Sequence, residues 1–255
     1  MSIDMPVNRF KQAIAARQPQ IGLWSSLTGT VGAEIGAGAG FDWILLDSEH
    51  SPNDIASLLL ALQTVAPYPT QAIVRPPIGD AVTIKRLLDI GAQTLLIPMV
   101  ETVEQAQALV AATRYPPDGV RGVSSQTRAG RWGRINGYLK QAGEDICLLV
   151  QIESIRGLDN AAAIAAVDGV DGVFVGPSDL AAALGHLGET GHADVTAAVE
   201  RAGREIMAAG KPAGILIPDE KLAHHYLALG FTFVAVGVDT MLLARATSDL
   251  RQRFA

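Results

Sequence analysis

The chain has 255 residues, of which 49% are hydrophobic and 18% charged, and its formal net charge is −6. This composition predicts a large buried core, and the acidic balance excludes recruitment of nucleic acid or of an anionic membrane by a basic field. A single cysteine, Cys147, excludes an intramolecular disulfide. Because there is no signal-peptide core and no apolar run of roughly 20 residues, we expect a cytoplasmic protein.

Residues 1–20 mix charged and apolar residues at helical spacing, which predicts a short N-terminal helix. Eight short apolar runs follow, and most of them precede a longer segment of helical period that ends in Gly or Pro. The predicted strands cover residues 21–25, 43–47, 71–75, 94–99, 147–152, 172–175, 213–217 and 232–237.

These runs are apolar throughout rather than alternating, which is typical of parallel strands covered on both faces. Eight strand–helix units in about 250 residues match a single (β/α)8 barrel, a TIM barrel, over residues 1–255. An open, doubly wound sheet is the alternative, but it usually carries a GxGxxG turn directly after a strand. The nearest match, "GAEIGAGAG" at 32–40, lies in a predicted helix, so the barrel is favoured.

One connection is longer than the others, at residues 114–145 between the fourth and fifth strands. It carries five arginines and one lysine, but an acidic chain with few interleaved aromatic residues argues against a nucleic-acid role. We expect either a lid over the site or a subunit contact, and the sequence does not decide between them.

In such a barrel the catalytic groups project from the carboxyl ends of the strands. The polar residues predicted at these ends are Ser25, Ser26, Asp47, Ser48, Glu49, His50, Arg75, Gln151, Glu153, Ser178, Asp179, Asp219 and Asp239. Each also has a structural explanation. His50 can be a loop residue beside a helix cap at Ser51, Asp179 can be an N-cap, and Arg75 can be a partner for any nearby carboxylate.

Glu153 and Asp179 follow adjacent strands, and two such carboxylates suit Mg²⁺ or Mn²⁺. Gln151 lies two positions before Glu153, so both side chains point to the same side. Free backbone N–H groups after Gly176 suit a small carboxylate or phosphate. Together these features describe a site for a 2-oxo acid.

The five lysines argue against Schiff-base catalysis, because none falls at a predicted strand end of the active rim. His224 and His225 are neighbours on a helix rather than an i, i+4 pair of zinc ligands. Carbanion chemistry would therefore depend on a metal Lewis acid, with no organic cofactor.

Five motifs in order resemble the HpcH/HpaI family over about residues 22–238. They are "LLDSEHSPND", "IVRPP" with "IKRLLDIGAQTLLIPMV", "YPPDGVRGV…RWGRINGYL", "QIES" and "FVGPSDLA". The resemblance implies a metal-dependent (class II) pyruvate aldolase, a group that includes 4-hydroxy-2-oxoheptane-1,7-dioate aldolase and 2-dehydro-3-deoxyglucarate aldolase.

The resemblance also implies a role for each matching residue. His50 is the general base and Asp89 the residue that raises its basicity, a role that spacing alone does not suggest. Arg75 stabilises the enolate, and Glu153 and Asp179 are the metal ligands. The implied substrate contacts are Gln151, Ser178 and Arg75, to which the residues themselves add Gly176, Pro177, Asp179 and a pocket wall at Trp24. Asp47 and Glu49 are expected to support this set.

The implied reaction is reversible cleavage of 4-hydroxy-2-oxo acids to pyruvate, or a close analogue, and an aldehyde. The implied cofactor is Mg²⁺ or Mn²⁺, with Co²⁺ and Zn²⁺ as further options. Oxaloacetate decarboxylation and non-catalytic binding of a 2-oxo acid remain alternatives. The family's usual homo-oligomer, a hexamer built as a trimer of dimers, implies that the C-terminal helix docks in cis or is exchanged between subunits.

Overall fold

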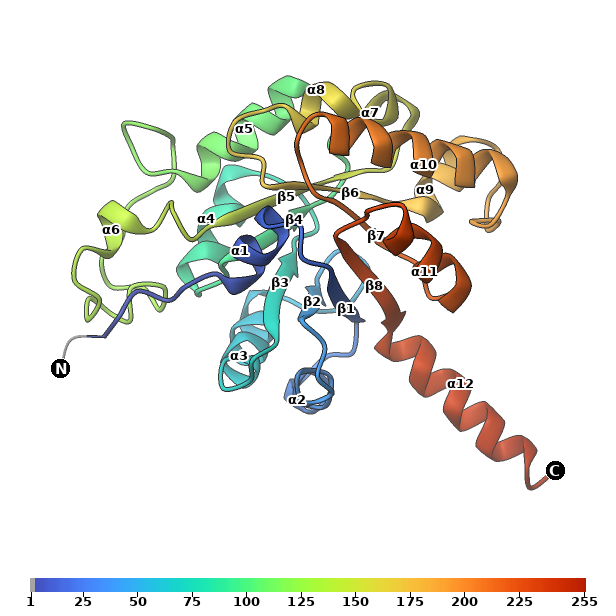
Figure 1. Ribbon diagram of the computed structural model, residues 1–255. Helices are drawn as coiled ribbons and strands as arrows, with labels where there is room; N and C mark the ends of the chain where they lie inside the picture. The colour runs from blue at the N-terminus through green and yellow to red at the C-terminus, as the bar shows by residue number, and fades with distance from the viewer. Residues whose placement is uncertain (1–2) are drawn as a thin grey trace.

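Within residues 3–255, which the computed structural model describes, parallel strands close into an eight-stranded barrel with β8 paired to β1 (Figure 1). The strands are β1 (Gln20–Ser25), β2 (Trp43–Asp47), β3 (Gln71–Arg75), β4 (Thr94–Ile97), β5 (Cys147–Ile152), β6 (Gly172–Val175), β7 (Ala213–Leu216) and β8 (Phe233–Val238). The predicted (β/α)8 fold is confirmed. Strands two, three, five and six have the predicted bounds, and the others differ by one or two residues.

Most helices lie outside the barrel, where they return the chain to its amino-terminal end, whereas the first helix closes that end and the last helix extends away. They are α1 (Arg9–Ala15), α2 (Thr30–Gly38), α3 (Ile55–Val65), α4 (Ala81–Asp89), α5 (Val103–Thr113), α6 (Tyr138–Gln141), α7 (Ile155–Asp159), α8 (Ala161–Ala165), α9 (Pro177–Ala183), α10 (Ala193–Ala208), α11 (Glu220–Ala228) and α12 (Asp239–Gln252). None of the helices in the described part of the chain is long and apolar enough to cross a membrane.

The cap of α3 differs from the sequence-based interpretation. Asp54 rather than Ser51 is the N-cap, and its carboxylate accepts hydrogen bonds from the backbone N–H groups of Ala56 and Ser57. The Ser51 hydroxyl instead donates to the backbone carbonyl of Asp47. The loop that carries His50 is thus tied back to the end of β2.

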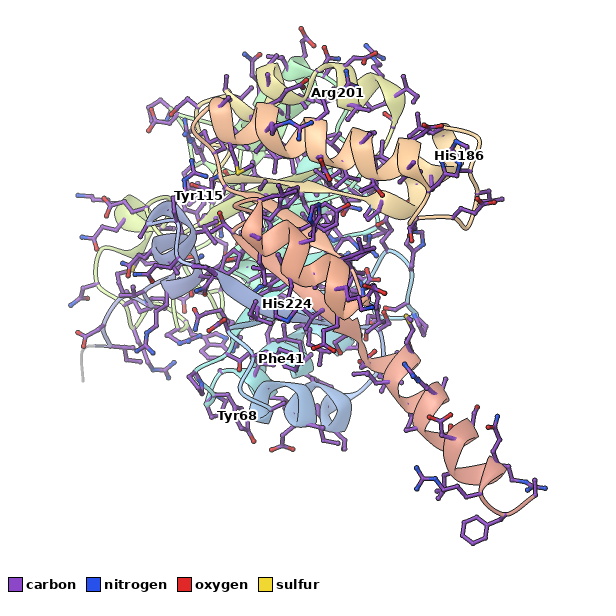
Figure 2. All side chains as sticks on the ribbon, turned by 45° about the vertical axis from the view of Figure 1, so that its right-hand side comes forward. Phe41, Tyr68, Tyr115, His186, Arg201 and His224 are labelled. Carbon is purple, nitrogen blue, oxygen red and sulfur yellow. The ribbon has the colours of Figure 1, made fainter. Side chains whose placement is uncertain are left out.

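The last helix, α12, extends away from the barrel, and beyond its first turn its side chains stand clear of the rest of the chain (Figures 1 and 2). None of its residues is buried. Met241, Leu242, Leu243 and Leu250 are each more than half exposed. The predicted apolar face is therefore present, and this chain does not cover it.

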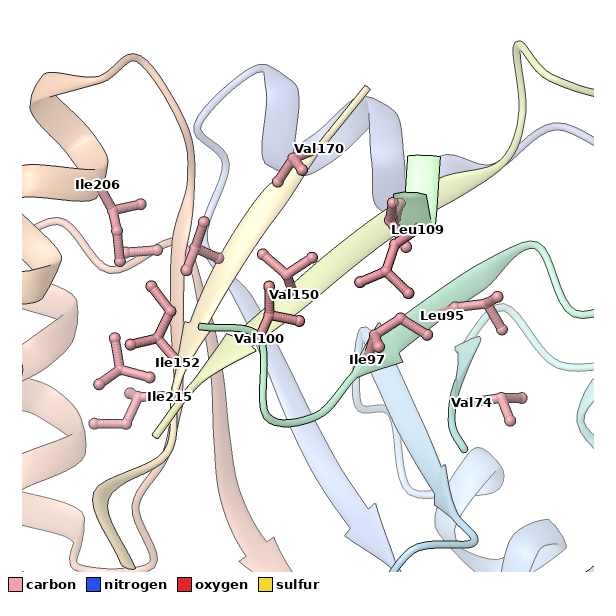
Figure 3. Close-up of a cluster of buried hydrophobic side chains, with 14 of the residues drawn as sticks. Val74, Leu95, Ile97, Val100, Leu109, Val150, Ile152, Val170, Ile206 and Ile215 are labelled. Atoms are coloured by element: carbon pink, nitrogen blue, oxygen red, sulfur yellow. The ribbon is translucent and has the colours of Figure 1, made fainter. Parts of the chain in front are cut away.

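The core has two parts that follow from alternation along the strands. In β5, Leu148, Val150 and Ile152 face the helices, whereas Cys147 and Leu149 face the barrel interior. Figure 3 shows part of the outer layer, where strand and helix side chains interdigitate. Both faces of each strand are thus covered, as the uniformly apolar runs predicted.

Helix α1 closes the amino-terminal end of the barrel. Phe10 and Ile14 are buried inside it, and the ring of Phe10 lies 6.0 Å from Trp43 and 5.8 Å from Phe233, both edge to face. A Cβ atom at Gly22 would lie 2.1 Å from the Trp43 ring, so only glycine leaves room for this packing. The amino-terminal end of the barrel is therefore filled by packed side chains.

The long segment 114–145 connects α5 to β5 and so meets the barrel at this same end. Its Arg128 donates to the backbone carbonyl of Ile90, and the backbone N–H of Ala129 donates to the carbonyl of Asp89. A lid over the chain's own active rim is therefore excluded.

Candidate active site

The ends of β2 and β3 hold a buried ion pair between Asp47 and Arg75. These two residues are register partners in the sheet. The Arg75 guanidinium donates from Nε to Asp47 Oδ1 at 2.9 Å and from Nη2 to Oδ2 at 2.7 Å, and neither side chain is more than 7% exposed. Such a two-point contact fixes the plane of the guanidinium. Burial raises the pKa of Asp47, but the hydrogen bonds and charge of Arg75 outweigh burial and hold that pKa below its usual value.

Trp24, from the end of β1, completes this arrangement. Its indole N–H donates to Asp47 Oδ2 at 3.2 Å, and the Arg75 guanidinium carbon lies 4.6 Å above its ring. Trp24 is 4% exposed and also packs against Phe174. It is therefore both part of the core and a wall of the site.

Glu49 and His50 follow the end of β2. The Glu49 carboxylate lies 2.7 Å from Arg75 Nη1, an ion pair that lacks hydrogen-bond geometry. Burial raises the pKa of Glu49 more than the charge of Arg75 lowers it. The His50 ring is 70% exposed, and its Nε2 lies 3.9 Å from Glu49. The imidazole thus stands at the mouth of the site, while the carboxylates lie deeper.

The ends of β5 and β6 contribute a buried acidic group. Glu153 is 4% exposed, accepts a hydrogen bond from the Met99 backbone N–H at 2.8 Å, and pairs with the Gln151 amide. Burial is the largest effect on Glu153 and, with the charges of Glu49 and Asp179, raises its pKa to about 7, although the Met99 N–H opposes the shift. Glu49 and Asp179 thus add negative charge around the buried Glu153 carboxylate.

Gly176 provides the space in which Glu153 sits. A Cβ atom at this position would lie 2.7 Å from Glu153 Oε2 and 3.0 Å from Gln151 Nε2. Gly176 is also the N-cap of α9, with Pro177 as its first residue. Asp179 lies in the first turn of α9 and is not its N-cap, so the alternative interpretation of this aspartate as an N-cap is wrong.

These groups surround one cavity of about 700 Å³ at the carboxyl ends of the strands. The predicted site residues that line it are Trp24, Asp47, His50, Arg75, Gln151, Gly176, Pro177, Ser178 and Asp179. Glu153 lies just behind Gln151 and Gly176. The structure therefore places every residue to which we assigned a role in the reaction at or beside this cavity, except one.

The exception is Asp89, which ends α4 at the opposite end of the barrel. Its carboxylate pairs with Arg121, whose Nη2 lies at 3.0 Å. His50 follows the carboxyl end of β2, so the length of the barrel separates the two residues within one chain.

Several cavity residues were not predicted. Thr190 and Gly191 reach it from the α9–α10 loop, and Leu222 and Met241 form an apolar part of its wall. Asp239, predicted at the rim, is occupied elsewhere, since it accepts hydrogen bonds from the Ser25 hydroxyl at 2.8 Å and the Ser26 N–H at 2.9 Å. No local sequence signal marks Thr190 or Gly191.

The donor set also suits a divalent cation. Glu153 and Asp179 offer carboxylate oxygens, the usual ligands of Mg²⁺ and Mn²⁺. Gln151 Oε1 is buried with no hydrogen-bond donor among the described residues. Burial raises the pKa values of Glu49 and Glu153, and neighbouring carboxylates add to both shifts, so a cation bound here would stabilise the charged forms. The residues present fit such an ion.

A (β/α)8 barrel whose rim joins a buried guanidinium, clustered carboxylates and an exposed imidazole defines an enzyme that stabilises a developing anion. Residues 20–246 match the model of the HpcH/HpaI aldolase/citrate lyase family. The chain belongs to this family, and it is accordingly an enzyme of the aldolase class, a carbon–carbon lyase.

Curated relatives agree with this assignment. Over its full length the chain is 60% identical to a hydroxypyruvate/pyruvate aldolase of Deinococcus radiodurans, of which it covers 92%. Over 97% of its length it is 56% identical to a 4-hydroxy-2-oxo-heptane-1,7-dioate aldolase of Salmonella heidelberg, of which it covers 94%. A solved HpcH/HpaI family structure from Burkholderia cenocepacia superposes with a TM-score of 0.94 at 40% identity, covering 97% of this chain and 99% of that one.

Proposed function

We propose that this chain cleaves 4-hydroxy-2-oxo acids reversibly to pyruvate, or a close 2-oxo acid analogue, and an aldehyde, with the help of a divalent metal ion. The relatives named as pyruvate and 4-hydroxy-2-oxo-heptane-1,7-dioate aldolases support this substrate class. The observation that carries the proposal is the guanidinium of Arg75, held rigidly at the wall of the cavity.

Arg75 is suited to stabilise an enolate oxygen. A guanidinium has five N–H donors, and the two hydrogen bonds to Asp47 account for two of them, while Glu49 contributes an ion pair at Nη1. Donors remain for a substrate oxygen, and the fixed plane of the group avoids reorganisation as charge develops. The two flanking carboxylates orient this cation.

Glu153 and Asp179 are the residues that would hold the metal ion, Mg²⁺ or Mn²⁺ by preference for oxygen ligands. A divalent cation there supplies Lewis-acid stabilisation of negative charge on the substrate keto oxygen. Gln151 and the Gly176–Ser178 backbone line the same part of the cavity, and we assign them to the substrate carboxylate.

We assign the proton transfer to His50. Its ring stands at the cavity mouth, where it can exchange protons with solvent, and histidine side chains titrate near neutral pH. In the cleavage direction it accepts the C4 hydroxyl proton as the C3–C4 bond breaks. In the synthetic direction it removes a methyl proton from pyruvate. Asp89 is not part of this assignment within one chain.

Deuterium exchange from solvent into the pyruvate methyl group, followed by proton NMR, tests the proposal. We expect exchange with added Mg²⁺ or Mn²⁺, its loss on chelation, and its loss in His50→Ala. His224→Ala is the matched control, because His224 is an equally exposed histidine on α11. A protein that binds pyruvate without exchanging its methyl protons is a binder, and the proposal would then be wrong.

The exposed apolar face of α12 leads us to propose a homo-oligomer in which this helix packs on a second copy. Met241, Leu242, Leu243 and Leu250 together form an apolar surface that a monomer leaves in water. Met241 also lines the active-site cavity, so the assembly would adjoin the site.

A further inference from the structure

The α9–α10 loop carries a cluster of ligand-type side chains that the proposed reaction does not use. Gly185 and Gly188 have positive φ angles of 85° and 83°, and they turn the chain tightly between the two helices. Backbone hydrogen bonds from Glu189 to His186 and from His192 to Glu189 continue these turns. The loop thereby stacks residues three positions apart on one side. Figure 2 shows His186 at the tip of the molecule near the start of α10.

The geometry of this cluster is that of a metal site. The rings of His186 and His192 are stacked, with centroids 3.5 Å apart and planes inclined by 17°. One carboxylate oxygen of Asp194 lies 3.1 Å from His186 Nε2 and 3.7 Å from His192 Nδ1. Ligand atoms of His186, Glu189 and His192 all fall within 4.8 Å of one another. Three side chains therefore bring ligand atoms together, and Asp194 contacts the two histidines of this group.

The surroundings favour ligation over a chance cluster of surface residues. His192 Nδ1 accepts a hydrogen bond from the Asp194 backbone N–H, which fixes the ring and leaves Nε2 as the nitrogen that can bind a cation once it gives up its proton. The two rings are only 25% and 35% exposed at the side chain. Both rings contact the Asp194 carboxylate and Glu189 adds a second acidic group, so the cluster offers nitrogen and oxygen ligands to a cation at the edge of the stacked rings.

We propose that His186, Glu189 and His192, with Asp194, form a second cation site, specific for a borderline divalent ion such as Zn²⁺, Ni²⁺ or Co²⁺. Imidazole nitrogens with carboxylate oxygens suit these ions, whereas Mg²⁺ prefers an all-oxygen set. The site is distinct from Glu153 and Asp179, and it depends on none of the roles assigned to them.

The position of the loop gives this second site a consequence. Thr190 and Gly191 lie between the ligands and also line the active-site cavity. An ion bound by residues on either side would clamp this stretch and fix one wall of the entrance. The second site would thus control the mobility of the entrance without touching the reacting atoms.

Zinc titration by calorimetry in excess Mg²⁺ tests the proposal, using the full-length protein. We expect one Zn²⁺ site that persists in Asp179→Asn and is lost in His186→Ala/His192→Asn. The loss should exceed roughly 100-fold in affinity, the upper end of what removing an outer-shell partner costs. Asparagine at position 192 can still cap α10, so the fold is retained, and circular dichroism checks this.

His224→Ala, on α11, is the matched histidine control and should leave the zinc stoichiometry unchanged. Co²⁺ offers a second readout, because imidazole ligation gives visible absorption bands that the double variant should lack. If the double variant bound as much Zn²⁺ as the wild type, or if Asp179→Asn abolished all zinc binding, the second site would be refuted.

Discussion

The carboxylate of Asp47 and the guanidinium of Arg75 face each other as register partners at the ends of β2 and β3, joined by hydrogen bonds of 2.9 and 2.7 Å. Because both are buried, replacing Asp47 with Asn leaves a buried cation without its main counter-ion. We expect Asp47→Asn to lower the free energy of unfolding by roughly 3 kcal/mol in urea titrations. Asp168→Asn, which removes an exposed partner of Arg114, should have little effect.

The shape of the Arg75 side chain matters as much as its charge. A lysine keeps one positive charge but cannot bridge Asp47 and Glu49 while also presenting donors to substrate. We therefore expect Arg75→Lys to lower kcat by roughly 100- to 1,000-fold, as for loss of an oxyanion donor, with a smaller change in KM. Steady-state kinetics would check this against Arg204→Lys on the exposed face of α10. Unchanged turnover would remove Arg75 from the mechanism.

Gly176 should be intolerant of a side chain. Its Cβ would lie 2.7 Å from Glu153 Oε2 and 3.0 Å from Gln151 Nε2, so both buried side chains would have to leave their present positions. We expect Gly176→Ala to weaken metal binding by about 10-fold or more, the scale on which supporting contacts affect affinity. Gly143→Ala is the control, because no atom lies within 4 Å of its Cβ position. Equal metal affinities in the two variants would contradict the assignment.

The raised pKa of Glu153 makes the stability of the metal-free protein depend on pH. The folded chain keeps this proton up to about pH 7, whereas the unfolded chain loses it near 4.5. The folded state then binds more protons in this window, so the free energy of unfolding should fall as pH rises through it. Urea unfolding of the chelated protein at pH 5 and 7.5 should show a steeper fall for the wild type than for Glu153→Gln. Equal slopes would show that Glu153 titrates normally.

The same proton competes with the cation. Metal binding should strengthen as pH rises through about 7 and should release a proton, because the cation requires Glu153 in its charged form. Calorimetry in buffers of different ionisation enthalpy measures this proton directly. If no proton were released on metal binding at pH 6, Glu153 would not be a metal ligand.

The exposed face of α12 predicts an effect on assembly. Leu243→Glu places a charge among apolar residues that we assign to a subunit contact, so we expect smaller particles in light scattering after gel filtration. Gln252→Glu adds the same charge at the end of the helix without removing an apolar side chain. If both variants kept the wild-type mass, this face of α12 would lie outside the interface.

Most of the barrel could be predicted because parallel strands covered on both faces leave uninterrupted apolar runs. β2 begins after Asp42 and ends at Asp47, and β3 ends at Arg75, directly before Pro76. β4 ends before its predicted limit because Pro98 and Met99 continue the apolar run after the strand has ended. Met99 has a φ of 55°, and its backbone N–H serves Glu153 instead of the sheet.

The site was predictable where its residues follow strands and not where tertiary contacts decide their use. Asp47 and Arg75 are each the last residue of their strand. Because β2 pairs with β3 in this register, the two side chains lie next to each other. The role of Asp239 could not be predicted from sequence. Its carboxylate is hydrogen-bonded to the end of β1, and this contact exists only because β8 pairs with β1 to close the barrel. Asp89 shows another limit: a residue at the end of a returning helix lies at the wrong end of the barrel for its own chain's rim.

The packed rings of Phe10, Trp43 and Phe233 close the amino-terminal end of the barrel, so the barrel opens only at the carboxyl ends of its strands. Reactants and products must all pass through the same opening, so the two products of one cleavage leave one after the other. Under the proposed assignment the oxo acid lies deeper, near Glu153, so we expect the aldehyde to leave before it. The aromatic residues at the amino-terminal end of the barrel thereby influence the order in which products leave the site at the opposite end.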